Sequence, residues 1–299
     1  CISLSYVELP VELVRTFAEI VAAGSLDGAA ARLSVTPSAV SQRLKALESR
    51  LGRVLIVRSK PVAVTEAGRV VLRLARQLAA IEQDALAELG LDDPAAGVPL
   101  AVNADSLATW FLAALAPLAA AGMTFELFRD DQEYTAGLLE SGTVSAAVTS
   151  QQRPVPGCSS RPLGAIRYLP VASPAFASRW FGDGRDAAAF EAAPLVDYDR
   201  RDALQTRYLT GLGAAPARPP RHYVPASADF ATAVLLGFGW ALVPEQQSVP
   251  ALADGRLVRL DGQPVDVPLH WQRWKLDSPV LARIEDAVVG AARAVLRPV

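Results

Sequence analysis

Apolar residues recur at helical spacing near the start of the chain. The stretch 9–23 has an apolar stripe with a period near 3.6 residues, which predicts an amphipathic helix. Gly24 is a suitable stop for this helix, and Ser25 is a suitable N-cap for a short alanine-rich helix over 26–33. We therefore expect two helices joined by a tight turn.

The next segment, 37–50, combines an apolar face with a polar one. Thr36 is a good N-cap and Pro37 is tolerated at the first helical position, so a helix is predicted to begin here. The apolar face recurs at intervals of four, three and four residues, through Val40, Leu44, Leu47 and Leu51. The opposite face carries hydrogen-bonding and cationic groups, namely Ser38, Ser41, Gln42 and Lys45.

A two-stranded hairpin with a basic tip is predicted over 54–64. A short helix, a turn, a polar-faced helix and a basic hairpin are typical of a winged helix-turn-helix, whose second helix enters the major groove of DNA. The alternative is an ordinary solvent-facing helix, but the cap and the hairpin favour the DNA-binding interpretation. The residues predicted to contact bases or phosphates are Thr36, Pro37, Ser38, Ser41, Gln42, Arg43, Lys45, Arg58 and Lys60.

A long helix is predicted over 66–89, with a narrow apolar seam close to coiled-coil spacing. The seam consists of Leu74, Leu78, Ile81 and Ala85. Nothing in the first 60 residues looks long enough to bury it, so we expect a second copy of the chain to cover it. The residues that follow, 90–99, are rich in Asp, Pro and Gly and predict a linker.

From residue 99 the pattern becomes an alternation of strands and helices, which predicts a largely parallel sheet. Strands are expected near 99–103, 123–128, 144–149, 166–172, 194–197, 239–243 and 267–274. Helices are expected near 106–121, 132–141, 201–210, 227–237 and 278–296. Loops at the carboxyl ends of such strands are where open α/β folds bind ligands.

Composition narrows the classes of function. The chain has 299 residues, of which 51% are hydrophobic and 20% charged, so it is long enough for about two globular domains. No apolar run reaches the roughly 18 residues of a membrane span, and no secretory signal is apparent, so a cytoplasmic protein is expected. Two cysteines and two histidines argue against a disulfide framework, a metal site or a Ser-His-Asp triad. With no Gly-rich phosphate loop or nucleophile–base pair either, we do not expect an enzyme, a metal or a cofactor.

Charge is distributed unevenly along the chain. The net charge is −2, yet residues 32–60 hold seven basic residues and one acidic residue, Glu48. Residues 91–299 hold 18 basic and 22 acidic residues. A basic segment on an acidic body is the footprint expected of a localised nucleic-acid contact.

The segment Pro37–Glu48, followed by Leu51-Gly52 and Arg58, resembles the N-terminal signature of LysR-type transcriptional regulators. The Thr65-Glu66-Ala67-Gly68 stretch is similar to the entry of that family into its linker helix. The resemblance implies an α/β multidomain protein with three functional parts and a hinge. These are a winged helix-turn-helix (1–65), a dimerising linker helix (66–90), a hinge (91–98) and an effector domain like a periplasmic binding protein (99–299). Lobe I of that domain would be 99–167 with 270–299, and lobe II 168–269.

Three further segments, 101–111, 154–158 and 270–274, resemble the ArgP/LysG branch of the family. That branch controls export of basic amino acids, so the resemblance implies lysine or arginine as the effector. It also implies double-stranded operator DNA as a partner, a homodimer or homotetramer, and contact with RNA polymerase. Arg129 departs from the acidic residue expected beside Asp130, which weakens the carry-over there. A different effector, such as an aromatic acid, and a ligand-indifferent nucleoid or origin-binding role stay open.

An amino-acid effector would need partners for its charges. Carboxylates would bind ammonium groups, while a helix N-terminus and hydroxyl groups would bind the carboxylate. For each acid, helix capping or a solvated loop is the alternative role, and the tryptophans are expected in the core. The candidate effector-binding residues are Asp105, Ser106, Thr109, Asp130, Asp131, Thr149, Asp199, Asp202, Ser227 and Asp229.

Overall fold

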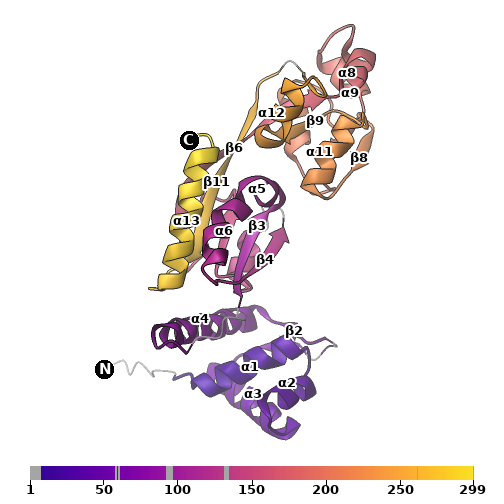
Figure 1. Cartoon of the computed structure of the whole chain (residues 1–299). Coiled ribbons are helices and arrows are strands. Elements are labelled where there is room, and N and C mark those ends of the chain that lie inside the picture. The colour runs from indigo at the N-terminus through magenta and orange to yellow at the C-terminus, as the bar shows by residue number, and fades with distance from the viewer. Residues whose placement is uncertain are drawn as a thin grey trace, which may run out of the picture.

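A computed structural model describes residues 8–57, 59, 61–91, 97–130, 135–260 and 262–298. Figure 1 shows a helical N-terminal unit, a long helix beside it, and two α/β lobes beyond. No helix among the described residues is long and apolar enough to cross a membrane. Helices and strands both contribute to the described fold, so this is a mixed α/β protein.

The N-terminal unit holds the three helices that the pattern predicted. They are α1 (Val11–Ala23), α2 (Leu26–Leu33) and α3 (Pro37–Leu51). Val40, Leu44 and Leu47 of α3 are buried against Phe17 and Ile20 of α1, so the predicted apolar face is confirmed.

Glycines end two of these helices. Gly24 (φ 68°) and Gly52 (φ 60°) lie in the left-handed region, where glycine has no steric penalty. The expected N-caps also form, because Ser25 Oγ accepts from the Gly28 N–H at 3.1 Å and Thr36 Oγ1 from the Ala39 N–H at 3.2 Å.

The predicted hairpin is present as β1 (Ile56–Val57) and β2 (Ala63–Val64), which pair antiparallel. Thr65 Oγ1 donates to the Val54 carbonyl at 2.7 Å and accepts from the Gly68 N–H at 3.0 Å. Gly68 is buried so close to the hairpin that a side chain there would collide with the Leu55 carbonyl. The Thr-Glu-Ala-Gly stretch therefore joins the hairpin to the long helix α4 (Glu66–Glu88).

Helix α4 corrects one expectation about its apolar seam. Leu74 and Leu78 are partly buried because they pack against the core of the N-terminal unit, so the expectation that this unit is too short to bury any of the seam is wrong. Ile81 (51% exposed) and Ala85 stay exposed in the single chain.

The main sheet has the strand order β10-β6-β11-β5-β3-β4, with β9 paired to β6. Its strands are β3 (Val98–Asn103), β4 (Phe125–Asp130), β5 (Ala146–Thr149), β6 (Cys158–Ala172), β9 (Ala241–Pro244), β10 (Val258–Arg259) and β11 (Val265–Trp274). Only the β3–β4 and β3–β5 pairs are parallel, and the other pairs of this sheet are antiparallel. The expectation of a largely parallel sheet is therefore wrong, because β6 and β11 run against each other.

The long strands β6 and β11 pass between two lobes, as Figure 1 shows. We call the part around β3, β4 and β5 lobe I. Its helices are α5 (Ala104–Ser106), a π-helical turn η1 (Leu107–Phe111), α6 (Leu112–Ala120), α7 (Thr135–Glu140) and α13 (Pro279–Val295). The single helix predicted over 106–121 is thus built from α5, η1 and α6.

Lobe II is the part around β9 and a second, two-stranded parallel sheet. That sheet consists of β7 (Leu195–Asp197) and β8 (Arg221–Tyr223). Its helices are α8 (Pro174–Phe181), α9 (Ala187–Ala192), α10 (Leu204–Gly211), α11 (Ser227–Leu235) and α12 (Glu245–Ala253). The pattern had missed α8, α9, α12, β8 and β10, all of which are short elements. Trp110, Trp240, Trp271 and Trp274 are buried in the core, as expected.

Candidate functional site

Helix α3 presents an exposed polar face to the outside of the N-terminal unit. Thr36, Pro37, Ser38, Gln42 and Lys45 are exposed, and Ser41 is partly buried. Because the opposite face is fixed in the core, these side chains lie together on one side of the helix. This is the geometry that a recognition helix needs.

Arg43 lies apart from that group. Its guanidinium pairs with Glu12 and donates to Thr16 Oγ1, so it ties α3 to α1. Glu48 has a related structural role, because its Oε1 accepts from the Leu55 N–H at 2.8 Å and fixes the hairpin to α3. Arg58 and Lys60, predicted at the hairpin tip, lie outside the described residues.

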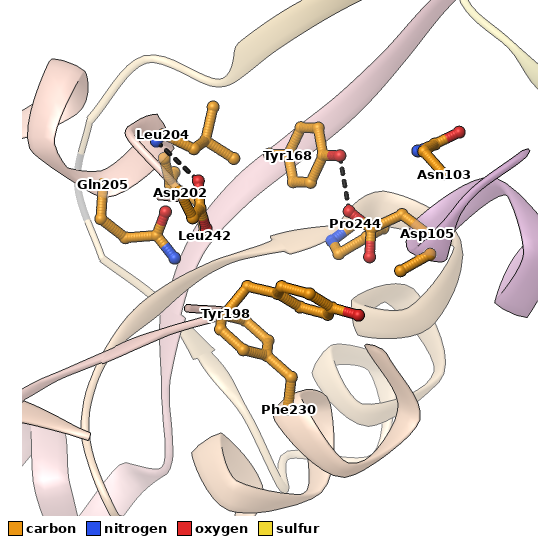
Figure 2. A pocket seen from close by; sticks show the side chains of 11 residues that line it. Asn103, Asp105, Tyr168, Tyr198, Asp202, Leu204, Gln205, Phe230, Leu242 and Pro244 are labelled. Carbon is orange, nitrogen blue, oxygen red and sulfur yellow. Dashed lines mark hydrogen bonds between the residues drawn. The ribbon is translucent and has the colours of Figure 1, made fainter. Parts of the chain in front are cut away.

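A cavity of about 60 Å³ lies between lobes I and II, and Figure 2 shows its walls. Two carboxylates line it, and no Lys or Arg is among the lining residues that the structure describes. The lining residues are Asn103, Ala104, Asp105, Tyr168, Tyr198, Asp202, Leu204, Gln205, Phe230, Leu242 and Pro244.

Asp105 connects three parts of this site. It follows β3 in lobe I, and its Oδ2 accepts from the Tyr168 hydroxyl on β6 at 2.6 Å. Its Oδ1 accepts from Ser227 Oγ, at the start of α11 in lobe II, at 2.7 Å. Burial raises the pKa of the Asp105 carboxyl, and the two hydrogen bonds offset part of that effect. The side chain therefore bridges the lobes at the point where they face each other.

Asp202 supplies the second carboxylate, from the loop before α10, on the other side of the cavity (Figure 2). Its Oδ1 accepts from the Leu204 N–H at 2.8 Å, which fixes the orientation of the carboxylate. Two amide oxygens on lining residues, Asn103 Oδ1 and Gln205 Oε1, are buried without a hydrogen-bond partner among the described residues. The polar part of this cavity therefore combines two carboxylates with amide and tyrosine hydroxyl groups.

The structure does not bring every candidate to the cavity. Ser106 is buried beside it without lining it, and Thr109 Oγ1 donates to the Asp105 carbonyl at 2.6 Å. Thr149 is buried and its Oγ1 accepts from the Gln151 N–H at 3.1 Å. These two hydroxyl groups are engaged with the backbone.

The remaining acidic candidates lie elsewhere. Asp199 accepts from the N–H groups of Arg201 and Asp202, so it caps a turn, and these bonds hold the pKa of its carboxyl below its usual value against the opposing effect of burial. Asp229 is exposed in the first turn of α11. Asp131 and the side chain of Asp130 lie outside the described residues.

Of the 11 lining residues, sequence reasoning named Asp105 and Asp202 and missed the other nine. Four of those nine come from separate elements. Tyr168, Tyr198, Gln205 and Phe230 are brought together by β6, the β7–α10 loop, α10 and α11. An aromatic or amide residue in an apolar stretch gives the same sequence pattern whether it lies in the core or lines a binding site. Only the folded arrangement separates the two roles.

Two segments that resemble the ArgP/LysG branch meet in lobe I through Gln272. This side chain is fully buried, and its Oε1 accepts from the Val155 N–H at 2.9 Å. Its Nε2 donates to the carbonyls of Gln151 and Arg153 at 2.7 and 3.1 Å. The two segments that resemble this branch, 154–158 and 270–274, therefore lie together in the fold and are joined by hydrogen bonds.

Two family profiles match the chain. The profile described as "Bacterial regulatory helix-turn-helix protein, lysR family" matches residues 11–69. The LysR substrate binding domain profile matches residues 91–288. Together they cover the helical unit and both lobes.

Characterised proteins resemble the chain over nearly its whole length. The lysine export transcriptional regulatory protein LysG of Corynebacterium efficiens is 44% identical over 288 residues, covering 94% of this chain and 97% of that protein. The crystal structure of ArgP from Mycobacterium tuberculosis has a TM-score of 0.92 at 44% identity, covering 98% of this chain and 100% of that one.

A solved structure with a ligand is also similar. Full-length LysG from Corynebacterium glutamicum, with bound effector Arg, has a TM-score of 0.85 at 38% identity. It covers 97% of this chain and 100% of that one. The profiles, the relatives and the fold agree, and the chain belongs to the LysR family of DNA-binding transcriptional regulators.

Proposed function

We propose that this regulator senses a basic amino acid, arginine or lysine, and controls genes for amino-acid export. The observation that carries the proposal is the inter-lobe cavity, where the two charged groups among the described lining residues, Asp105 and Asp202, are carboxylates. An effector with two cationic groups matches that lining. The names of the relatives, a lysine export regulator and an arginine-bound LysG, support the same class of effector.

The two carboxylates suit the two ends of such a ligand. Asp105 and Asp202 come from different lobes, so a ligand that pairs with both holds the lobes together. Asn103 and Gln205 add two amide groups to the same lining, and an amide can accept as well as donate hydrogen bonds. An aromatic acid has no cationic group to pair with Asp105 and Asp202, so the described lining favours a basic amino acid over that alternative.

The DNA-binding role rests on the exposed face of α3. We propose that Ser38, Gln42 and Lys45 contact DNA, with Thr36 and Pro37 at the helix end close to the phosphates, and that Arg58 and Lys60 contact the backbone from the hairpin. In this proposal residues 1–65 bind DNA, residues 66–90 pair two copies of the chain, and residues 99–299 bind the effector. Ile81 and Ala85, which are exposed in the single chain, would be covered by a second copy.

Regulation follows from linkage between these parts. The ligand stabilises one arrangement of the lobes, and it changes DNA binding only as far as it binds the two arrangements differently. The protein then acts in the cytoplasm as a dimer or tetramer on operator DNA, in contact with RNA polymerase, and without catalysis. Broad DNA binding that ignores amino acids would favour the nucleoid or origin-binding role instead.

Thermal unfolding of the full-length protein with each common amino acid tests the effector. At 100 times its Kd a ligand should stabilise the protein by about 2.7 kcal/mol. We expect this for arginine or lysine, and we expect Asp105→Asn and Asp202→Asn each to weaken binding at least tenfold. Asp229→Asn, which removes an exposed carboxylate outside the cavity, serves as the matched control. No selective shift, or an equal loss in the control, would contradict the proposal.

A further inference from the structure

A second and much larger cavity lies between the long helix and lobe I. It measures about 790 Å³, against about 60 Å³ for the inter-lobe cavity. Helix α4 forms one wall through Arg76, Ala79 and Gln83, and lobe I forms the other, in part through Phe128 and Trp274. A volume of this size is in the range of small-molecule sites and far above ordinary packing voids.

Two hydrogen-bond donors on residues of these walls lack partners among the described residues. They are Nη1 of Arg76 and the indole Nε1 of Trp274, whose side chain is only 1% exposed. Burial lowers the pKa of Arg76 from its usual value, and the nearby charge of Glu126 offsets part of that effect. Trp274 is enclosed in a core cluster of lobe I, so the group in these walls that favours a ligand with oxygen acceptors is the partly buried guanidinium of Arg76.

The cavity faces away from the apolar seam of α4. Successive residues of a helix are rotated by about 100°, so positions two apart lie on nearly opposite sides. Arg76 is two residues from both Leu74 and Leu78, and Gln83 is two residues from Ile81. A second copy that covers the exposed part of the seam, Ile81 and Ala85, would therefore leave the cavity open, which argues for a small molecule as its occupant.

The charges around the cavity limit the ligand further. Arg76 and Arg283 are balanced by Asp84 and Glu126 in the same lining. A polyanion would be repelled by the two carboxylates, whereas one carboxylate can sit beside the guanidinium of Arg76. The rest of the walls is mainly apolar, with Met123, Phe128, Leu86 and Val280 among its residues.

We propose that this cavity is a second small-molecule site, which binds an amphipathic monocarboxylate with its acid group at Arg76. Because α4 is continuous with the DNA-binding unit, an occupant contacts the DNA-binding side and the effector side of the molecule at once. Arg73, on a neighbouring face of α4, already donates to the Pro156 carbonyl of lobe I at 3.0 Å. A ligand would stabilise this packing of α4 on lobe I, and the affinity of the protein for DNA would change when the ligand binds.

Isothermal titration of the full-length protein with octanoate tests the site. Saturating arginine is present throughout, so that the inter-lobe cavity is occupied. We expect saturable binding of octanoate, at least tenfold weaker binding in Arg76→Gln, and no binding of octanol or octylammonium. Arg69→Gln removes an exposed arginine on the same helix outside the cavity, and it should bind octanoate like the parent.

A second variant distinguishes loss of the binding site from loss of folding. Ala79→Trp places a bulky side chain at the cavity wall, and it should remove octanoate binding without lowering the melting temperature. Absence of saturable octanoate binding in the parent would overturn the proposal. So would undiminished binding in both Arg76→Gln and Ala79→Trp, or a loss of equal size in Arg69→Gln.

Discussion

At the scale of single residues, the carboxyl of Asp105 lies where burial and hydrogen bonding have opposite effects on its pKa. Its carboxyl is bound by Tyr168 and Ser227 from two other elements, and burial still raises its pKa. A carboxyl whose pKa is raised on folding contributes most to stability when it is protonated, and that contribution is lost as the pH rises through the folded-state pKa. Above the unfolded-state pKa, the burial of the Asp105 carboxyl therefore lowers the stability of the ligand-free protein, and a cationic effector beside it would reduce that loss.

The variant Asp105→Asn tests this effect on stability in the absence of ligand. Because the amide is neutral at every pH, the ligand-free variant should be more stable than the parent at pH 7.5. The difference should shrink toward pH 4, as the parent carboxyl becomes protonated. Urea unfolding at the two pH values measures it. A variant that is less stable than the parent by the same amount at both would show that the two hydrogen bonds outweigh the charge.

At the scale of elements, lobe I depends on one buried amide that joins a loop to a strand. Gln272 on β11 satisfies backbone groups of residues 151, 153 and 155, which no regular secondary structure serves. A buried N–H or carbonyl left without a partner costs about 1–3 kcal/mol. The loop therefore stays in place because of a side chain that is remote from it in the sequence.

We predict that Gln272→Leu lowers the free energy of unfolding by about 1–3 kcal/mol, because leucine fills the space without replacing the hydrogen bonds. Gln152→Ala, which changes an exposed glutamine in the same loop, should stay within about 0.5 kcal/mol of the parent. Chemical denaturation of both variants gives the comparison. Equal stabilities for Gln272→Leu and the parent would mean that water satisfies the loop.

At the scale of the whole molecule, the proposed function has two copies of the chain recognise DNA together. A dimer holds two recognition helices on two half-sites, so each substitution on α3 acts twice. The exposed face of α3 is small, and affinity for any DNA also depends on phosphate contacts that carry no sequence information. Specific and non-specific binding are therefore expected to respond differently to a change of Gln42.

We predict that Gln42→Ala weakens binding to a DNA sequence selected from a random library by about 1–3 kcal/mol for each half-site. Binding to unselected DNA should change much less, because Gln42 carries no charge. Binding isotherms on both DNAs at a fixed salt concentration measure the two losses. Arg32→Gln on α2 is the charge-removing control, and it should not alter the preference for the selected sequence. Equal losses for Gln42→Ala on both DNAs would remove this residue from base recognition.

The sequence by itself determined the helical unit and its polar face. Caps, glycine stops and a 3.6-residue period are local signals, so α1, α2 and α3 were predictable from neighbouring residues alone. The same local chemistry indicated a carboxylate after the first strand of the effector domain. Charge along the chain pointed to DNA, because a basic cluster is a property of sequence.

Only the tertiary structure decided the strand directions and the two cavities. The antiparallel pairing of β6 with β11 is a non-local contact, and short elements such as α9 or β8 have too few residues to show a period. Tyr168, Ser227 and Asp202 are separated from Asp105 by 63, 122 and 97 positions in the printed sequence, so no spacing rule links them. The sequence likewise indicated a DNA contact for Arg43, and only the folded position of Glu12 shows that Arg43 also pairs with α1. Local signals fix the elements, while packing between distant elements fixes the site.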